Sequence, residues 1–183
     1  MALLKIARLG NPVLRARANE VEPAELARPD VQQLIDDMIE TMRDAPGVGL
    51  AAPQVHRSMR LFVMDPGDDD DGPRSQLRVV VNPELTFPSD EKMRLWEGCL
   101  SIPGLRGETE RWAAVDVACL DREGRPTRLS FRGYPAAIVQ HETDHLDGVL
   151  FLARMPDPLE IAFEEEFRRW VRPDADSESE ENL

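Results

Sequence analysis

The stretch PAAIVQHETDHL, residues 135–146, decides the architecture expected for this chain. A proline in the first turn favours the start of a helix, and Gly148 follows at the position of a C′ stop. His141 and His145 are four residues apart, so a helix places both imidazoles on one face, where they can bind one metal ion. The stretch therefore predicts a metal-binding helix.

Glu142 follows the first of these histidines and lies about 100° further round the predicted helix. It can reach a water molecule at the metal without being a ligand, which is the arrangement that a general base requires. The alternative is an amphipathic helix that carries two surface histidines. The chain has only three histidines, and two of them flank this glutamate, which favours the metal site.

Two histidines leave a tetrahedral catalytic site one protein ligand short. Cys99, in the segment EGCLS, offers a thiolate and would leave a fourth position open for water. A downstream carboxylate (Asp147, Asp157 or Glu160) would instead indicate a zinc endopeptidase in which Cys99 has no role. A site closed by four protein ligands would indicate a metal-stabilised binding module without catalysis.

A third segment, GVGLAAPQ at residues 47–54, is rich in small residues. It has neither the spacing nor the Lys-Ser/Thr ending of a phosphate-binding loop. It brings backbone close to a neighbouring group and then presents the amide of Gln54.

These three segments, in this order, resemble the hallmarks GxGLAAxQ, EGCxS and QHExDH of the bacterial-type peptide deformylase family. The resemblance extends from about residue 11 to about residue 155. It departs at Glu110, where the family usually has a proline before the arginine that Arg111 matches. It implies an α+β fold and hydrolysis of the formyl group from N-formylmethionyl peptides, which gives formate and a free N-terminal methionine.

The resemblance also implies a role for each motif residue. Metal binding falls to Cys99, His141 and His145, general-base catalysis to Glu142, and stabilisation of the oxyanion to Gln54 and the backbone N–H of Leu100. The ion implied is Fe(II), with Ni(II), Co(II) or Zn(II) as substitutes. The partners implied are nascent formylated peptides at the ribosome.

Substrate contacts are expected on both sides of the metal. Val48, Tyr134, Ala137 and Ile138 are candidates for an apolar methionine pocket, although their composition fits a core equally well. Gly49, without a side chain, would let a peptide backbone lie alongside in strand-like pairing.

Composition limits the remaining possibilities. A chain of 183 residues with 42% apolar residues is sufficient for one domain, expected over residues 1–172, ahead of an acidic tail at residues 173–183 that we expect to be disordered. The net charge is −13, to which the Asp68–Asp71 loop and the last part of the chain contribute most. This argues against direct binding to nucleic acid, and no apolar run is long enough for a membrane span.

We expect a cytoplasmic protein. The basic first nineteen residues leave a transit peptide as an alternative, but the stretch is poor in serine. Cys99 and Cys119 are expected to be free thiols, and Cys119 is expected to be buried. The sequence does not predict an oligomeric state.

The predicted fold is α+β, with short antiparallel strands packed around the central metal-binding helix and with a C-terminal helix. Apolar spacing predicts an amphipathic helix at residues 30–42 with Asp30 as N-cap. Strands are expected at residues 60–64, 77–81, 113–120 and 127–131. The C-terminal helix is expected at residues 158–171, with five residues facing inward: Leu159, Ala162, Phe163, Phe167 and Trp170.

Overall fold

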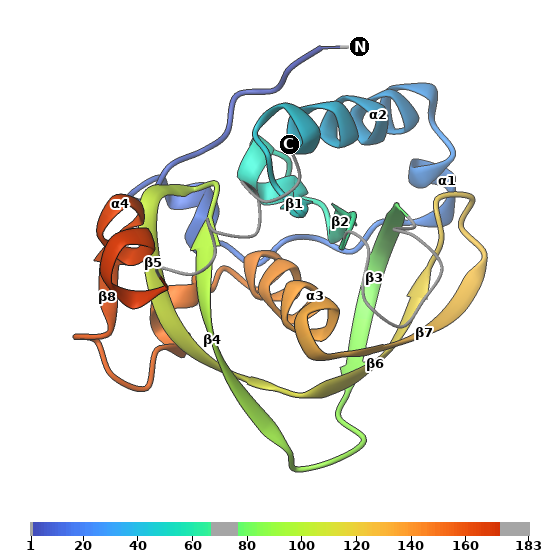
Figure 1. Cartoon of the computed structure of the whole chain (residues 1–183). Coiled ribbons are helices and arrows are strands. Elements are labelled where there is room, and N and C mark those ends of the chain that lie inside the picture. The colour runs from blue at the N-terminus through green and yellow to red at the C-terminus, as the bar shows by residue number, and fades with distance from the viewer. Residues whose placement is uncertain (1, 67–76, 173–183) are drawn as a thin grey trace, which may run out of the picture.

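The computed structural model describes residues 2–66 and 77–172 (Figure 1). The predictions for the Asp68–Asp71 loop and for residues 173–183 lie outside the described residues. The predicted α+β fold is confirmed: antiparallel strands surround helix α3 (Gly133–Leu146), which lies in the middle of the molecule in Figure 1. No helix in the described part is long and apolar enough to cross a membrane.

Two antiparallel sheets frame this helix. The five-stranded sheet has the order β1-β2-β3-β6-β7, and the three-stranded sheet has the order β4-β5-β8. The strands of the first are β1 (Gly49–Ala51), β2 (Leu61–Met64), β3 (Arg78–Thr86), β6 (Ala114–Leu120) and β7 (Pro126–Arg132). Those of the second are β4 (Lys92–Cys99), β5 (Ile102–Trp112) and β8 (Ile161–Phe163).

Helix α3 is held by apolar packing against the five-stranded sheet. Ile138, Val139 and Leu146 of the helix belong to one buried cluster with Phe62 and Val115 of the strands. Full burial of one such side chain contributes about 1.5–3 kcal/mol. The helix is buried on most of its circumference, so the polar residues of its metal motif are held inside the protein.

Helix α2 (Pro29–Asp44) packs the apolar face predicted from its spacing against β1 and β2. The predicted N-cap is wrong: Arg28 occupies that position, and Asp30 lies in the first turn. A carboxylate in the first turn still stabilises the helix through its dipole, which explains why the sequence signal pointed to this end.

Strand β3 continues beyond the predicted apolar run. Its register with β6 shifts between Val81 and Glu84, and Asn82 adopts a positive φ of 49°. The Asn82 side chain bonds to both the N–H and the C=O of Val21 across this irregularity. The strand therefore continues through Asn82 and Pro83, although this pair in a sequence usually indicates the end of a strand.

Strands β4 and β5 form a long hairpin that the sequence prediction missed. Their outward side chains are mostly charged, for example Arg94 beside Glu108. The hairpin places Cys99 at the end of β4.

The C-terminal helix is real but short, and its predicted extent is wrong. The segment forms β8 on the edge of β5, then the single turn α4 (Glu164–Glu166) and a π-helical turn (Phe167–Val171). Leu159, Phe163 and Trp170 are 85%, 67% and 68% exposed, so they do not face inward as predicted. Pairing with the free edge of β5 satisfies backbone hydrogen-bonding groups, and this outweighs the helical pattern.

The remaining elements are short: the 3-10 turns Pro12–Arg15, Ala52–Val55 and Phe151–Arg154, and α1 (Pro23–Leu26). Asn11 caps the first of them, and its side chain accepts a hydrogen bond from the Val13 N–H.

Candidate metal centre and active site

Cys99, His141 and His145 form a group of potential metal ligands. Their donor atoms all lie within 4.8 Å of one another, and Cys99 Sγ is 3.3 Å from His145 Nε2. The helix α3 supplies both histidines on one face, and the end of β4 supplies the thiol. One sulfur and two imidazole nitrogens, with a place left for water, are the donor set of a catalytic metal site.

The downstream carboxylates do not join this group. Among the described residues, the group contains none of Asp147, Asp157 and Glu160. Asp147 instead pairs with Arg60, at 2.6 Å. This arrangement favours the thiolate as third ligand over the endopeptidase arrangement.

Glu97 orients His141. The Nδ1–H of His141 donates to Glu97 Oε2 at 2.7 Å, so that Nε2 keeps its lone pair for a metal ion. Burial opposes ionisation of Glu97, but hydrogen bonds from His141 and Arg111 outweigh it and hold the pKa of Glu97 below its usual range. Burial keeps the pKa of His145 well below its ordinary value, which favours the neutral imidazole that binds metal.

A buried ion-pair network supports Glu97. Arg111 donates to Glu97 at 2.7 and 2.9 Å and to Asp144 at 2.5 Å, and Asp144 also accepts from Arg154. The Arg111–Asp144 pair is shielded from solvent, since the two side chains are only 3% and 10% exposed.

Glu142 is buried beside the metal ligands. Its Oε2 has no hydrogen-bond partner among the described residues, and burial raises the pKa of Glu142 to about 7. A Cβ atom at Gly49 would overlap the Glu142 carboxylate. The missing side chain of Gly49 therefore makes room for Glu142, in addition to any room it leaves for a substrate.

Gln54 points its amide towards the thiol ligand. Its Oε1 accepts from the Ala51 N–H at 2.8 Å, while Nε2 donates to Ser101 Oγ at 3.2 Å and lies 3.8 Å from Cys99 Sγ. The first bond fixes which end of the amide faces the site, so that N–H groups are presented there.

The N-terminal strap, residues 2–9, supports the same place from behind. The Ala7 N–H donates to the Gln54 carbonyl at 2.7 Å, and the Leu9 N–H donates to the Ser101 carbonyl at 2.8 Å. Sequence reasoning missed these contacts, because backbone hydrogen bonds between distant segments leave no residue signature. Leu100 lies against Gly47, where a Cβ atom would come within 2.8 Å of Leu100 Cδ1.

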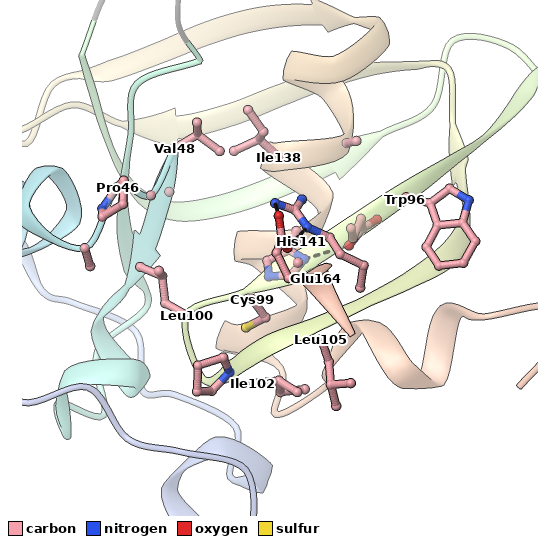
Figure 2. A pocket seen from close by; sticks show the side chains of 18 of the residues that line it. Pro46, Val48, Trp96, Cys99, Leu100, Ile102, Leu105, Ile138, His141 and Glu164 are labelled. Carbon is pink, nitrogen blue, oxygen red and sulfur yellow. Dashed lines mark hydrogen bonds and ion pairs between the residues drawn. The ribbon is translucent and has the colours of Figure 1, made fainter. Parts of the chain in front are cut away.

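A cavity of about 610 Å³ opens beside the metal ligands (Figure 2). All five residues that the sequence suggested for substrate contact line it: Val48, Gly49, Tyr134, Ala137 and Ile138. Ala137 and Ile138 are buried, whereas Tyr134 is 52% exposed. Sequence reasoning missed several other lining residues, including Trp96, Leu105, Arg106, Glu164 and Arg168.

Comparison with known proteins agrees with this geometry. A family model described as polypeptide deformylase matches residues 3–160. Peptide deformylase 2 of a Nostoc species is 42% identical over 172 residues, which cover 92% of this chain and 95% of the relative. Peptide deformylase 1A of Arabidopsis thaliana, named as chloroplastic/mitochondrial, is 41% identical and is matched over 84% of this chain and 61% of the relative.

A solved structure has the same fold. The class I type b peptide deformylase from Acinetobacter baumannii, bound to Met-Ala-Ser, superposes with a TM-score of 0.79 at 40% identity, over 84% of this chain and 99% of that one. The matched region includes the Cys/His/His metal-binding site and the helix that carries it. This chain belongs to the peptide deformylase family, whose members are hydrolases.

Proposed function

We propose that residues 1–172 form the catalytic domain of a deformylase that uses Cys99, His141 and His145 as metal ligands and Glu142 as general base. The observation that carries this proposal is the buried, unpartnered Glu142 oxygen beside three converging ligand atoms. The substrate is an N-formylmethionyl peptide, and the products are formate and a peptide with a free N-terminal methionine.

The donor set fits a divalent ion. We propose Fe(II) as the working ion, as the family resemblance implies, with Ni(II), Co(II) or Zn(II) as substitutes. Thiolate and imidazole ligands accept all four ions, and the order of their affinities does not decide among them. When bound, such an ion acts as a Lewis acid and lowers the pKa of water towards neutrality. Activity measured after loading each metal separately, with and without air, tests the choice.

Glu142 moves the proton in this mechanism. A pKa near 7 suits a general base at neutral pH. Its carboxylate accepts a proton from the attacking water as the oxygen of that water bonds to the formyl carbon. It then delivers the proton to the amine nitrogen as the C–N bond breaks.

Gln54 and the backbone N–H of Leu100 stabilise the negative charge that grows on the formyl oxygen. The bond from the Ala51 N–H to Gln54 Oε1 holds the Gln54 N–H groups towards the thiol ligand before substrate arrives. Loss of one donor of this kind typically costs about 2.7–4 kcal/mol, so Gln54→Ala should lower kcat about a hundredfold or more.

The methionine side chain occupies the apolar part of the cavity. Ala137 and Ile138 lie about one turn before His141 on α3, so they form its inner wall, and Val48 and Tyr134 form the more exposed part. Gly49 offers backbone to the peptide. We place the reaction on nascent chains at the ribosome in the cytoplasm, without direct contact between this chain and nucleic acid.

Formate release tests the function. The protein, prepared without oxygen and loaded with Fe(II) or Ni(II), should release formate from formyl-Met-Ala-Ser. Glu142→Ala should abolish release while the measured metal content stays the same. The control Glu20→Ala removes an exposed carboxylate and should match wild type. A metal-loaded wild type that releases no formate would contradict the proposal.

Cys99→Ser separates this function from the zinc endopeptidase alternative. We expect the variant to lose metal, because the thiolate is one of only three protein ligands. The endopeptidase reading predicts that metal stays bound. Elemental analysis after dialysis distinguishes the two.

A further inference from the structure

The C-terminal segment, residues 161–171, forms a wall of the active-site cavity. Strand β8 pairs with β5 so that Ala162 lies opposite Arg106. Glu164 and Arg168 follow β8 and line the same cavity as the metal ligands, and Figure 2 shows Glu164 among them. The match to the family model covers residues 3–160 and so ends just before this wall.

Three charged side chains meet on this wall, and we call them the rim cluster: Arg106, Glu164 and Arg168. Arg106 donates to Glu164 through Nε at 2.5 Å and through Nη2 at 3.2 Å. Arg168 Nη2 lies 3.1 Å from the same carboxylate. Phe167 packs on Trp96, with ring centroids 5.0 Å apart, and so fixes the segment against β4.

Arg106 lies close to the reacting centre. A Cβ atom at Gly98 would come within 3.3 Å of its guanidinium carbon, and Gly98 precedes the ligand Cys99. The charge of Arg106 also acts on Tyr134 across the cavity, where it opposes the rise in the Tyr134 pKa that burial causes. Arg106 is thus one of the residues that line the cavity beside the metal ligands.

One carboxylate bridges two guanidinium groups in the rim cluster, so the three side chains together carry one net positive charge. Free guanidinium groups bind carboxylates strongly and often in a bidentate manner. Glu164 occupies both of them, so a peptide carboxylate must compete with it. The cavity, at about 610 Å³, has room for more than formyl-methionine. The substrate residues that follow formyl-methionine can therefore lie against this wall.

We propose that Glu164 sets the charge preference of this enzyme for the residues that follow formyl-methionine. The proposal rests on the deformylase function proposed above. With Glu164 in place, the excess of one positive charge gives a small preference for an acidic residue. Without it, two guanidinium groups become available and the preference increases.

Selectivity between two isosteric peptides measures this effect. Wild type, Glu164→Gln and Arg168→Gln, each loaded with Ni(II), are assayed on formyl-Met-Asp-Ser amide and formyl-Met-Asn-Ser amide. The quantity of interest is the ratio of the two kcat/KM values. Glu165→Gln is the matched control, because Glu165 is exposed and is not among the residues that line the cavity.

Glu164→Gln should raise the Asp/Asn ratio about two- to fivefold, the range expected for partly exposed charges. Arg168→Gln should lower the ratio, and Glu165→Gln should leave it at the wild-type value. Salt at about 1 M should reduce the gain, because it screens charges beyond about 3 Å.

An unchanged ratio in Glu164→Gln, or an equal rise in Glu165→Gln, would overturn the inference. The Asn peptide tests the function independently. If wild type releases formate from it while the ratio does not respond, only the role of Glu164 is wrong. If wild type releases no formate from either peptide, the proposed function fails and the inference fails with it.

Discussion

Two clusters of arginines and carboxylates lie near the active site, one behind the metal ligands and one on the wall of the cavity. In the deep cluster, Arg111 bridges Glu97 and Asp144. In the rim cluster, Glu164 bridges Arg106 and Arg168. In each cluster one charged side chain pairs with two side chains of the opposite charge. The two clusters differ in how far they are exposed to water.

Burial separates the two clusters. The side chain of Arg111 is 3% exposed, whereas that of its rim counterpart Arg106 is 34% exposed. Removing water makes an unpaired charge very costly, so each member of the deep cluster depends on the others. At the rim, water replaces a lost partner at little cost. The deep cluster can therefore hold His141 rigidly, and the rim cluster can vary without loss of the fold.

The same substitution in both clusters gives the largest expected difference. Arg111→Met should lower the free energy of unfolding by about 3–5 kcal/mol, because Glu97 and Asp144 would remain buried without their common partner. Arg106→Met should cost about 1 kcal/mol or less. Urea unfolding monitored by circular dichroism measures both. Similar losses in the two variants would mean that burial does not distinguish the clusters.

Two glycines provide the second contrast. Gly49→Ala places a methyl group where the buried Glu142 carboxylate lies, so the carboxylate must leave its position. A displacement of about 1 Å at a catalytic group can cost about a hundredfold, so kcat should fall to that degree. Gly98→Ala meets the end of the longer Arg106 side chain at 3.3 Å, and this side chain can shift towards solvent.

Steady-state kinetics on formyl-Met-Ala-Ser distinguishes the two glycine variants. We expect Gly98→Ala to retain most of kcat and to change mainly KM. The measured metal content should stay at the wild-type level in both. Equal loss of kcat in the two variants would show that the Arg106 side chain is held as rigidly as the Glu142 carboxylate.

The sequence was informative where one local pattern carries the chemistry. The spacing of His141 and His145 predicts one face of a helix, and that is where the structure has them. Apolar spacing likewise predicted α2 and the inward face of β6. The alternation of Val115, Val117 and Cys119 is enough to place Cys119 inside, where burial raises the pKa of its thiol to about 11.

The rest depends on contacts between distant segments. Strands β4 and β5 stabilise each other across a hairpin, and neither has an apolar run of its own. The C-terminal segment has helical spacing, but the free edge of β5 recruits it as β8. Glu164 therefore reaches the cavity only through a strand pairing that the local pattern does not reveal.

The smallest expected effect is the pH dependence of the free energy of unfolding, which tests whether the rim cluster acts through charge. The hydrogen bond from Arg106 holds the pKa of Glu164 below its ordinary value of 4.5. A lowered pKa means that the pair stabilises the fold above about pH 4.5 and that this contribution disappears as the pH falls through the lower, folded value. At pH 7, Glu164→Gln should be less stable than wild type by under about 1 kcal/mol.

The difference in unfolding free energy between wild type and Glu164→Gln, followed from pH 7 into this acidic window, should shrink towards zero. Glu165→Gln, the matched control, should track wild type throughout. A difference that persists at low pH would mean that Glu164 supports the wall by packing rather than by charge. In that case the rim would resemble the deep cluster, where removing a partner disturbs the structure itself, and a change in peptide selectivity could no longer be assigned to charge alone.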